Sequence, residues 1–205
     1  DAKGYQYHSW IYDRIKCTGL KVKILMVFMK ALPHKVFRIA GDRWYGSMNA
    51  PQIASKYGHS WTSTLTRTYV HADLKVFKEK EMEQGESHFM YCEEINCNVV
   101  VWRDKGLVFA CSNDLRPYGG FVARNTGVTS DPARPAPELI VWYNEIKAMV
   151  DSFDGKCLGL GSMEMAITSH KWWHCLFFGL LDGVLANLDV ICREAGVAKN
   201  RFEML

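Results

Sequence analysis

The pattern of apolar and polar positions in the first third of the chain predicts strands and helices in alternation. The run KVKILMVFMKAL has helical length and strong helix-forming residues, and it stops at Pro33. Gly58 marks the end of a second, shorter helix. The predicted elements are a strand at 5–12, a helix at 21–32, a strand at 35–42, a helix at 49–57 and a strand at 61–69.

The pattern changes after residue 70. A charged segment at 73–86 predicts helix or loop, and short strands are predicted at 88–91, 98–103 and 107–111. Residues 130–137 hold three prolines and predict a linker, and helices follow to the end. We therefore expect an α/β fold with a helical C-terminal part, divided into residues 1–70, a β-rich insertion at 71–130, and residues 131–205.

The helix predicted after Pro137 has two distinct faces. Asn144, Lys147, Asp151 and Asp154 recur at spacings of three and four and share a polar face. Two carboxylates three residues apart repel each other unless a cation or solvent lies between them. Both a metal site and a solvated surface fit this face. Apolar residues at helical spacing form the other face: Leu139, Trp142, Tyr143, Ile146, Val150 and Phe153.

Composition and charge narrow the class of protein only slightly. Of the residues, 48% are hydrophobic and 23% charged, as in ordinary globular domains, and the net charge is +3. Residues 1–45 hold nine Lys/Arg against three Asp, which suits a polyanion or an ordinary solvated surface. The seven cysteines have no Cys-x-x-Cys spacing and predict free thiols in an intracellular protein. The apolar segment 172–191 contains Asp182 and Asp189, which favours a buried helix over a membrane span.

Asp42 is the first candidate for chemistry, because it ends a predicted strand. Ligands and reacting groups collect at this edge of open α/β sheets. An aspartate that caps a turn is the alternative, since Asp is common after strands. Asp1 gives little independent signal, because no strand precedes it in the sequence.

Five motifs in order resemble the piggyBac transposase family and its domesticated relatives. The segment DAKGYQY at Asp1 resembles the run that follows the first aspartate of the family. DRWYGS at Asp42 resembles its Asp-Asn-Phe/Trp-Phe-Thr-Ser motif, and YNEIKAMVDSFDG around Asp151 resembles its Tyr-Asn-x-x-Lys-Gly-Gly-Val-Asp-x-x-Asp-Gln motif. VWRDK at 101–105 and KWWHCLFFGLLD at 171–182 resemble two further family segments.

This resemblance implies a ribonuclease-H-like core interrupted by a β-rich insertion, with a metal-binding aspartate triad at Asp1, Asp42 and Asp151. Asp154 would be an auxiliary acid of the catalytic site. Two Mg²⁺ or Mn²⁺ ions would serve strand cleavage and strand transfer at TTAA targets. We expect phosphate contacts at Arg43, Lys147 and Lys171, although these are equally well solvated surface charges. Trp172 and Trp173 are expected to anchor the core.

The resemblance implies DNA, both transposon ends and target, as the partner, and the nucleus as the compartment. It allows a homodimer and implies neither a membrane nor a small-molecule cofactor. It also places a strand before Asp1, so we expect the chain to begin inside the catalytic domain. Ala148 and Met149 replace the family's Gly-Gly, and Arg43 replaces its Asn. A domesticated or decayed relative that binds DNA or protein without catalysis is therefore the alternative, and a structural protein without a DNA role is a third possibility.

Overall fold

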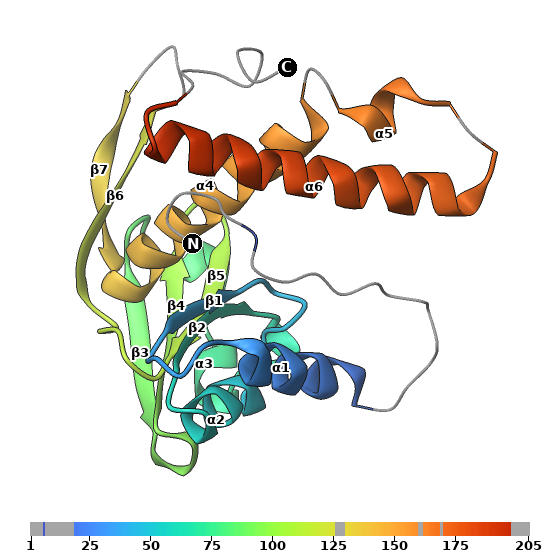
Figure 1. Ribbon diagram of the computed structural model, residues 1–205. Helices are drawn as coiled ribbons and strands as arrows, with labels where there is room; N and C mark the ends of the chain where they lie inside the picture. Colours follow the sequence, from blue (N-terminus) through green and yellow to red (C-terminus); the bar gives the residue numbers. More distant parts are fainter. Residues whose placement is uncertain (1–5, 7–18, 126–129, 160–161, 169, 198–205) are drawn as a thin grey trace. The chain divides into compact units, whose positions relative to one another are not determined.

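A computed structural model describes residues 6, 19–125, 130–159, 162–168 and 170–197, apart from the side chains of 124–132. The contacts within the chain define two compact units (Figure 1). One unit comprises residues 12–144, and the other comprises residues 1–11 with 145–205. Asp1 and nearly all of the strand predicted at 5–12 lie outside the described residues.

A five-stranded mixed sheet is the centre of the unit 12–144. Its spatial order is β1-β2-β5-β4-β3, so β1 and β3 are the edge strands among the described residues. β1 runs parallel to β2, and the remaining pairs are antiparallel. The strands are β1 (Arg38–Gly41), β2 (Ser60–Leu65), β3 (Ser87–Cys92), β4 (Cys97–Arg103) and β5 (Leu107–Ser112). These overlap the predicted strands, with two differences. The strand predicted at 35–42 is shorter, since β1 covers only Arg38–Gly41, and the one predicted at 61–69 ends at Leu65 and continues as a 3₁₀ helix, Arg67–Tyr69.

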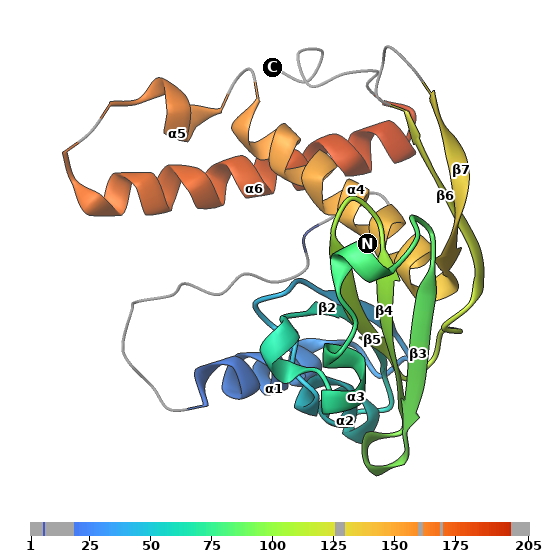
Figure 2. The same cartoon turned by 180° about the vertical axis from the view of Figure 1, so that it is seen from behind.

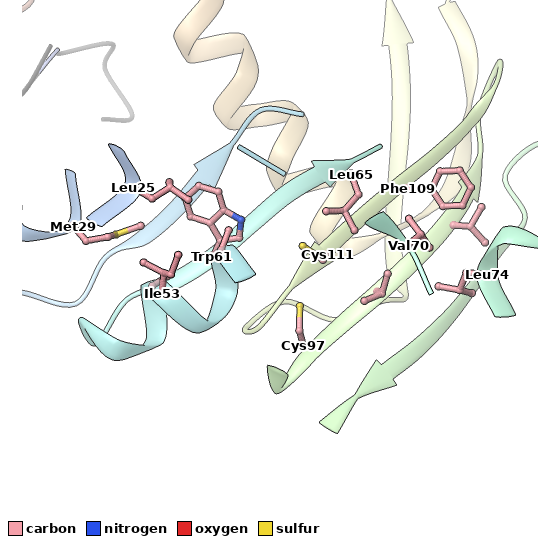
Figure 3. Packing of buried hydrophobic residues seen from close by; sticks show 14 of the residues in the cluster. Leu25, Met29, Ile53, Trp61, Leu65, Val70, Leu74, Cys97, Phe109 and Cys111 are labelled. Carbon is pink, nitrogen blue, oxygen red and sulfur yellow. The ribbon is translucent and has the colours of Figure 1, made fainter. Parts of the chain in front are cut away.

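Three helices supply the core on one face of this sheet: α1 (Leu20–Ala31), α2 (Asn49–Lys56) and α3 (Ala72–Lys75). α1 and α2 confirm the predicted helices, and they appear on the same side of β1 and β2 in both views (Figures 1 and 2). The indole of Trp61 lies among Leu25, Met29 and Ile53 from the two helices (Figure 3). Trp61 is 2% exposed, and its Nε1 donates a hydrogen bond to Ser63 Oγ at 3.0 Å. The polar atom of this buried ring is therefore satisfied.

Alternating residues of β4 and β5 build a second core on the opposite face. Val100, Trp102 and Ala110 pack there with Leu139 and Ile140. The last two residues begin α4 (Glu138–Leu158), which follows a two-stranded antiparallel sheet of β6 (Gly119–Asn125) and β7 (Ser130–Pro137). The period of two along β4 therefore sends Val99 and Val101 to one core and Val100 and Trp102 to the other.

The proline-rich segment 130–137 is β7, and the linker predicted there is wrong. A two-stranded sheet leaves each strand one edge without a partner strand, and prolines are tolerated at such edges. The carbonyl of Pro135 also accepts a hydrogen bond from Trp102 Nε1 at 2.9 Å. The linker was predicted because prolines break strands. The pairing with β6 and the hydrogen bond from Trp102 are tertiary contacts, which proline content does not reveal.

The described part of the second unit is mainly helical, as the sequence predicted. It contains the second half of α4, α5 (Met163–Ala166) and α6 (Trp172–Glu194). α6 has the length and hydropathy of a membrane span. Only 28% of its most apolar window is buried, whereas a core helix would be mostly buried. Its buried residues include Asp182 and Asp189, whereas apolar side chains such as Phe177 and Val184 are exposed. The expectation of a buried helix is therefore wrong, because α6 turns to the inside the hydrogen-bonded Asp182 and the ion-paired Asp189 instead of its apolar side chains.

Replacement of Gly41 by alanine tests the contact between β1 and Trp61. A Cβ at Gly41 would lie 2.2 Å from the buried Trp61 ring, which has no room to move. We expect Gly41→Ala to destabilise the protein by about 1–3 kcal/mol, because overpacking forces strain into a filled core. Chemical denaturation of the variant and wild type measures the change.

Gly155→Ala is the matched control. Gly155 lies in α4, and a Cβ there meets no atom within 4 Å. The substitution should stabilise the helix by about 0.5–1 kcal/mol. Equal effects of the two substitutions would show that Trp61 does not press on Gly41.

Candidate catalytic aspartates and the residues that hold them

Asp42 follows the last residue of β1 and is itself exposed. Its Oδ1 accepts hydrogen bonds from the backbone N–H groups of Trp44 at 3.1 Å and Tyr45 at 3.2 Å. Its carbonyl oxygen accepts from the N–H groups of Tyr45 and Gly46. Asp42 is thus a turn-capping aspartate, and these contacts fix the orientation of an exposed carboxylate. Asp42 can therefore be both the turn-capping residue and the candidate for chemistry that the sequence suggested as alternatives.

The turn that begins at Asp42 packs closely against β2. A Cβ at Gly46 would lie 2.0 Å from the carbonyl oxygen of Thr64. Only glycine fits here, because the atoms that a Cβ would meet belong to the backbone of Thr64 and Arg43 and cannot move aside as a flexible side chain could. The family's Asp-Asn-Phe/Trp-Phe-Thr-Ser motif gave no reason to expect this close approach. The contact links the Asp42 turn to the neighbouring strand.

Tyr45 lies in this turn, and Tyr143 contacts β2, the strand against which the turn packs. Burial raises the pKa of the Tyr45 phenol above its ordinary value, and the negative charge of Asp42 raises it further. The Tyr143 hydroxyl, from the first half of α4, lies 3.5 Å from Thr64 Oγ1. The beginning of α4 is therefore beside β2, the strand that pairs with β1.

The other predicted site residues are exposed on their elements. Asp151, Asp154 and Lys147 lie on the exposed face of α4, Arg43 lies in the Asp42 turn, and Lys171 precedes α6. The predicted apolar stripe of α4 is buried at Leu139 but exposed at Val150. Asp42 belongs to one unit and Asp151 to the other, so the convergence of these carboxylates stays a prediction. Asp1 is outside the described residues.

Within the described part of the chain, no group of three His, Cys, Asp or Glu side chains is arranged to hold a metal ion. Six of the cysteines are described, and all six are free thiols, as their spacing predicted. Trp172 is 79% exposed and Trp173 is 46% exposed, so the expectation that they anchor the core is wrong.

Asp182 has a structural role that the motif did not reveal. The carboxylate is 1% exposed and accepts three hydrogen bonds, from Ser162 Oγ at 2.8 Å and from the backbone N–H groups of Met163 and Glu164. These N–H groups belong to the first turn of α5, where they have no partner within the helix. A carboxylate of α6 therefore caps the start of α5 across the unit.

Asp189 and Asn187 hold two further segments of the same unit to α6. Asp189 is 2% exposed and pairs with Arg193 at 2.8 Å and with Lys156 of α4 at 3.9 Å. The Asn187 side chain accepts a hydrogen bond from Gln6 N and donates one to Gln6 O, both at 2.7 Å. The side-chain amide thus pairs with the backbone of Gln6 in the way that a neighbouring strand would.

Residues 9–187 match the protein family described as Transposase IS4. This chain belongs to that transposase family. The matched segment contains Asp42, Asp151 and Asp154. No curated protein matches the chain.

The fold of this transposase-family chain is also that of a solved transposase. It is similar to the piggyBac transposase in a cryo-EM structure of a synaptic complex with hairpin DNA, with a TM-score of 0.72 and 17% identity. The similarity covers 98% of this chain and 42% of that one, so the chain spans less than half the length of that transposase. The resemblance to piggyBac transposases and the α/β class are thereby confirmed.

Asp182→Asn tests whether the carboxylate caps α5. Oδ2 accepts from both Ser162 Oγ and the N–H of Glu164, and an amide nitrogen in either carboxylate position cannot accept. We expect a loss of about 1–3 kcal/mol of stability, because a buried donor is left without an acceptor. Glu145→Gln, an exposed carboxylate of α4, should change stability by less than about 0.5 kcal/mol. Urea denaturation that gave the same midpoint for both variants would contradict the capping role.

Proposed function

We propose that this chain is catalytic-domain sequence of a piggyBac-type DNA transposase that cleaves and joins DNA strands with divalent metal ions. The observation that carries the proposal is Asp42, a carboxylate fixed at the end of an edge strand by its own turn, inside a segment that matches a transposase family. The mixed sheet with parallel β1 and β2, joined through α2 and followed by α4, supports a ribonuclease-H-like core.

The proposed metal ligands are Asp1, Asp42 and Asp151, with Asp154 as an auxiliary acid. Carboxylate oxygens are the ligands that Mg²⁺ and Mn²⁺ prefer, and Asp42 fits this donor set because its turn holds Oδ1 while the side chain stays open to solvent. Bound ions would activate the attacking oxygen and stabilise the leaving one.

The chain's own residues supply positioning in this proposal. The backbone N–H groups of Trp44 and Tyr45 keep the Asp42 carboxylate oriented before any ligand arrives. Arg43, Lys147 and Lys171 are exposed cations, and we propose that they neutralise phosphates of the transposon end and the target. Because the substrate would be chromosomal DNA, the proposed compartment is the nucleus.

The metal site is tested by thermal melts with and without millimolar Mg²⁺ or Mn²⁺. Ions that bind only the folded chain should raise the melting temperature by mass action. Asp42→Asn and Asp151→Asn should each remove this gain, because each removes a ligand, whereas Glu145→Gln should keep it. A wild-type protein that gains no more than the variants would refute the metal site and favour a relative that binds without catalysis.

Salt dependence tests the phosphate contacts. Log affinity falls as log salt rises, and replacing one phosphate-binding cation should make this negative slope shallower by about 0.9 for duplex DNA. We expect this change for Arg43→Gln and Lys147→Gln, measured by fluorescence anisotropy with a labelled duplex. Lys105→Gln, at the exposed β4–β5 turn, should leave the slope unchanged. Slopes that are also unchanged for Arg43→Gln and Lys147→Gln would show that Arg43 and Lys147 do not contact DNA phosphates.

A further inference from the structure

Two exposed aromatic rings and one lysine form a surface patch next to Asp42. Trp44 is 41% exposed and Tyr69 is 47% exposed. The Lys21 ammonium lies 5.1 Å from the centre of the Trp44 ring and 5.9 Å from the centre of the Tyr69 ring. One cation therefore joins both rings, and we call these three residues the Trp44 patch. All three belong to the unit 12–144.

The Trp44 patch is held by the same turn as the candidate carboxylate. The backbone N–H of Trp44 donates to Asp42 Oδ1 at 3.1 Å, so the ring projects from the Asp42 turn. Its ring packs edge to face on Tyr45, with 4.6 Å between the centres and an interplanar angle of 87°. Tyr45 in turn packs against the main core. The Trp44 ring is therefore fixed although much of it is exposed.

Tyr69 is held separately, at the end of the 3₁₀ helix that follows β2. Its backbone N–H donates to the Thr66 carbonyl at 3.0 Å, and the hydroxyls of Thr66 and Thr68 are hydrogen-bonded at 2.9 Å. Lys21 comes from the first turn of α1. Three separate elements thus place their side chains in one patch.

The chemistry of the patch matches an unpaired nucleotide. Bases stack on exposed aromatic rings, while a neighbouring cation neutralises the backbone phosphate. The segment 19–45, which supplies Lys21 and Trp44, holds six Lys/Arg and a single acid, Asp42, so its charge favours a polyanion over an acidic or neutral protein partner. Intact duplex DNA does not offer this contact, because its bases are stacked inside the helix. Stacking of a base on such a ring is stronger than an exposed cation–π contact, so a base can displace Lys21 toward the phosphate.

We propose that the Trp44 patch binds an unpaired nucleotide of the DNA substrate beside Asp42. The inference rests on the proposed function and extends it, because it assigns to Trp44 and Tyr69 the recognition of a base that has left the duplex. Lys21 is assigned the adjoining phosphate. These residues position DNA and are not catalytic.

The test measures binding of the 205-residue chain to two labelled DNA probes in EDTA, where cleavage cannot occur. One probe is a blunt duplex, and the other is the same duplex with a short unpaired tail. We expect Trp44→Ala and Tyr69→Ala each to weaken binding of the tailed probe about tenfold and of the duplex less than about twofold, since each loses a stacking platform. Trp44→Phe should keep most of the affinity for the tailed probe.

The matched control is a second exposed aromatic pair in the same unit. Phe89 and Tyr118 are 51% and 56% exposed, and their ring centres lie 6.0 Å apart. Phe89→Ala and Tyr118→Ala should leave both affinities unchanged. A thermal melt of every variant verifies folding, and the Trp44→Phe result keeps the test valid if Trp44→Ala is unfolded. Equal losses on both probes, or no loss on the tailed probe, would overturn the inference.

Cleavage assays with Mg²⁺ separate this inference from the proposed function. Metal-dependent cleavage by a wild type whose tail binding is unaffected by Trp44→Ala would refute the Trp44 patch and leave the transposase proposal standing. Selective tail binding that depends on Trp44 and Tyr69, without any cleavage, would support the patch and favour a relative that binds DNA without catalysis.

Discussion

The packing of Trp61 on Gly41 is the contact on which the rest of the unit 12–144 depends. The indole occupies the space above β1 where any side chain at Gly41 would lie, and it fills the core shared by α1, α2 and β2. The sheet therefore fixes the end of β1 at Gly41, one residue before Asp42. Asp42 then caps its own turn, so the orientation of the candidate carboxylate depends on the hydrophobic contact between Trp61 and Gly41.

The second close approach, of Gly46 to the Thr64 carbonyl, continues this arrangement into the neighbouring strand. It places the turn against β2, and the first half of α4 reaches the same strand through Tyr143. The aromatic residues around Asp42 divide into a packed one, Tyr45, and an exposed one, Trp44. A rigid turn with an open carboxylate and an open ring is suited to binding a ligand, because little conformational entropy remains to be lost.

The unit that contains α6 is organised differently, by buried carboxylates. Asp182 caps α5 and Asp189 pairs with cations of α4 and α6, while Asn187 holds the backbone of Gln6. Burial of a charge is costly unless other groups compensate it: Asp182 accepts three hydrogen bonds, and Asp189 is ion-paired with Arg193 and Lys156. An apolar helix can therefore turn its few polar residues inward when they join other segments of the chain.

The sequence by itself determined the elements whose signal is local. The length of the run, its strong helix-forming residues and Pro33 defined α1, and β-branched and aromatic runs defined β2 to β5. Ordered motifs identified the transposase resemblance that the family match and the shared fold confirm. Asp42 was recognised because it closes a strand. Only the tertiary structure decided that 130–137 is a strand, because its pairing with β6 outweighs its proline content. It alone decided which way α6 faces and which rings surround Asp42, because these depend on contacts between residues far apart in the chain, such as Lys21 with Tyr69 and Ser162 with Asp182.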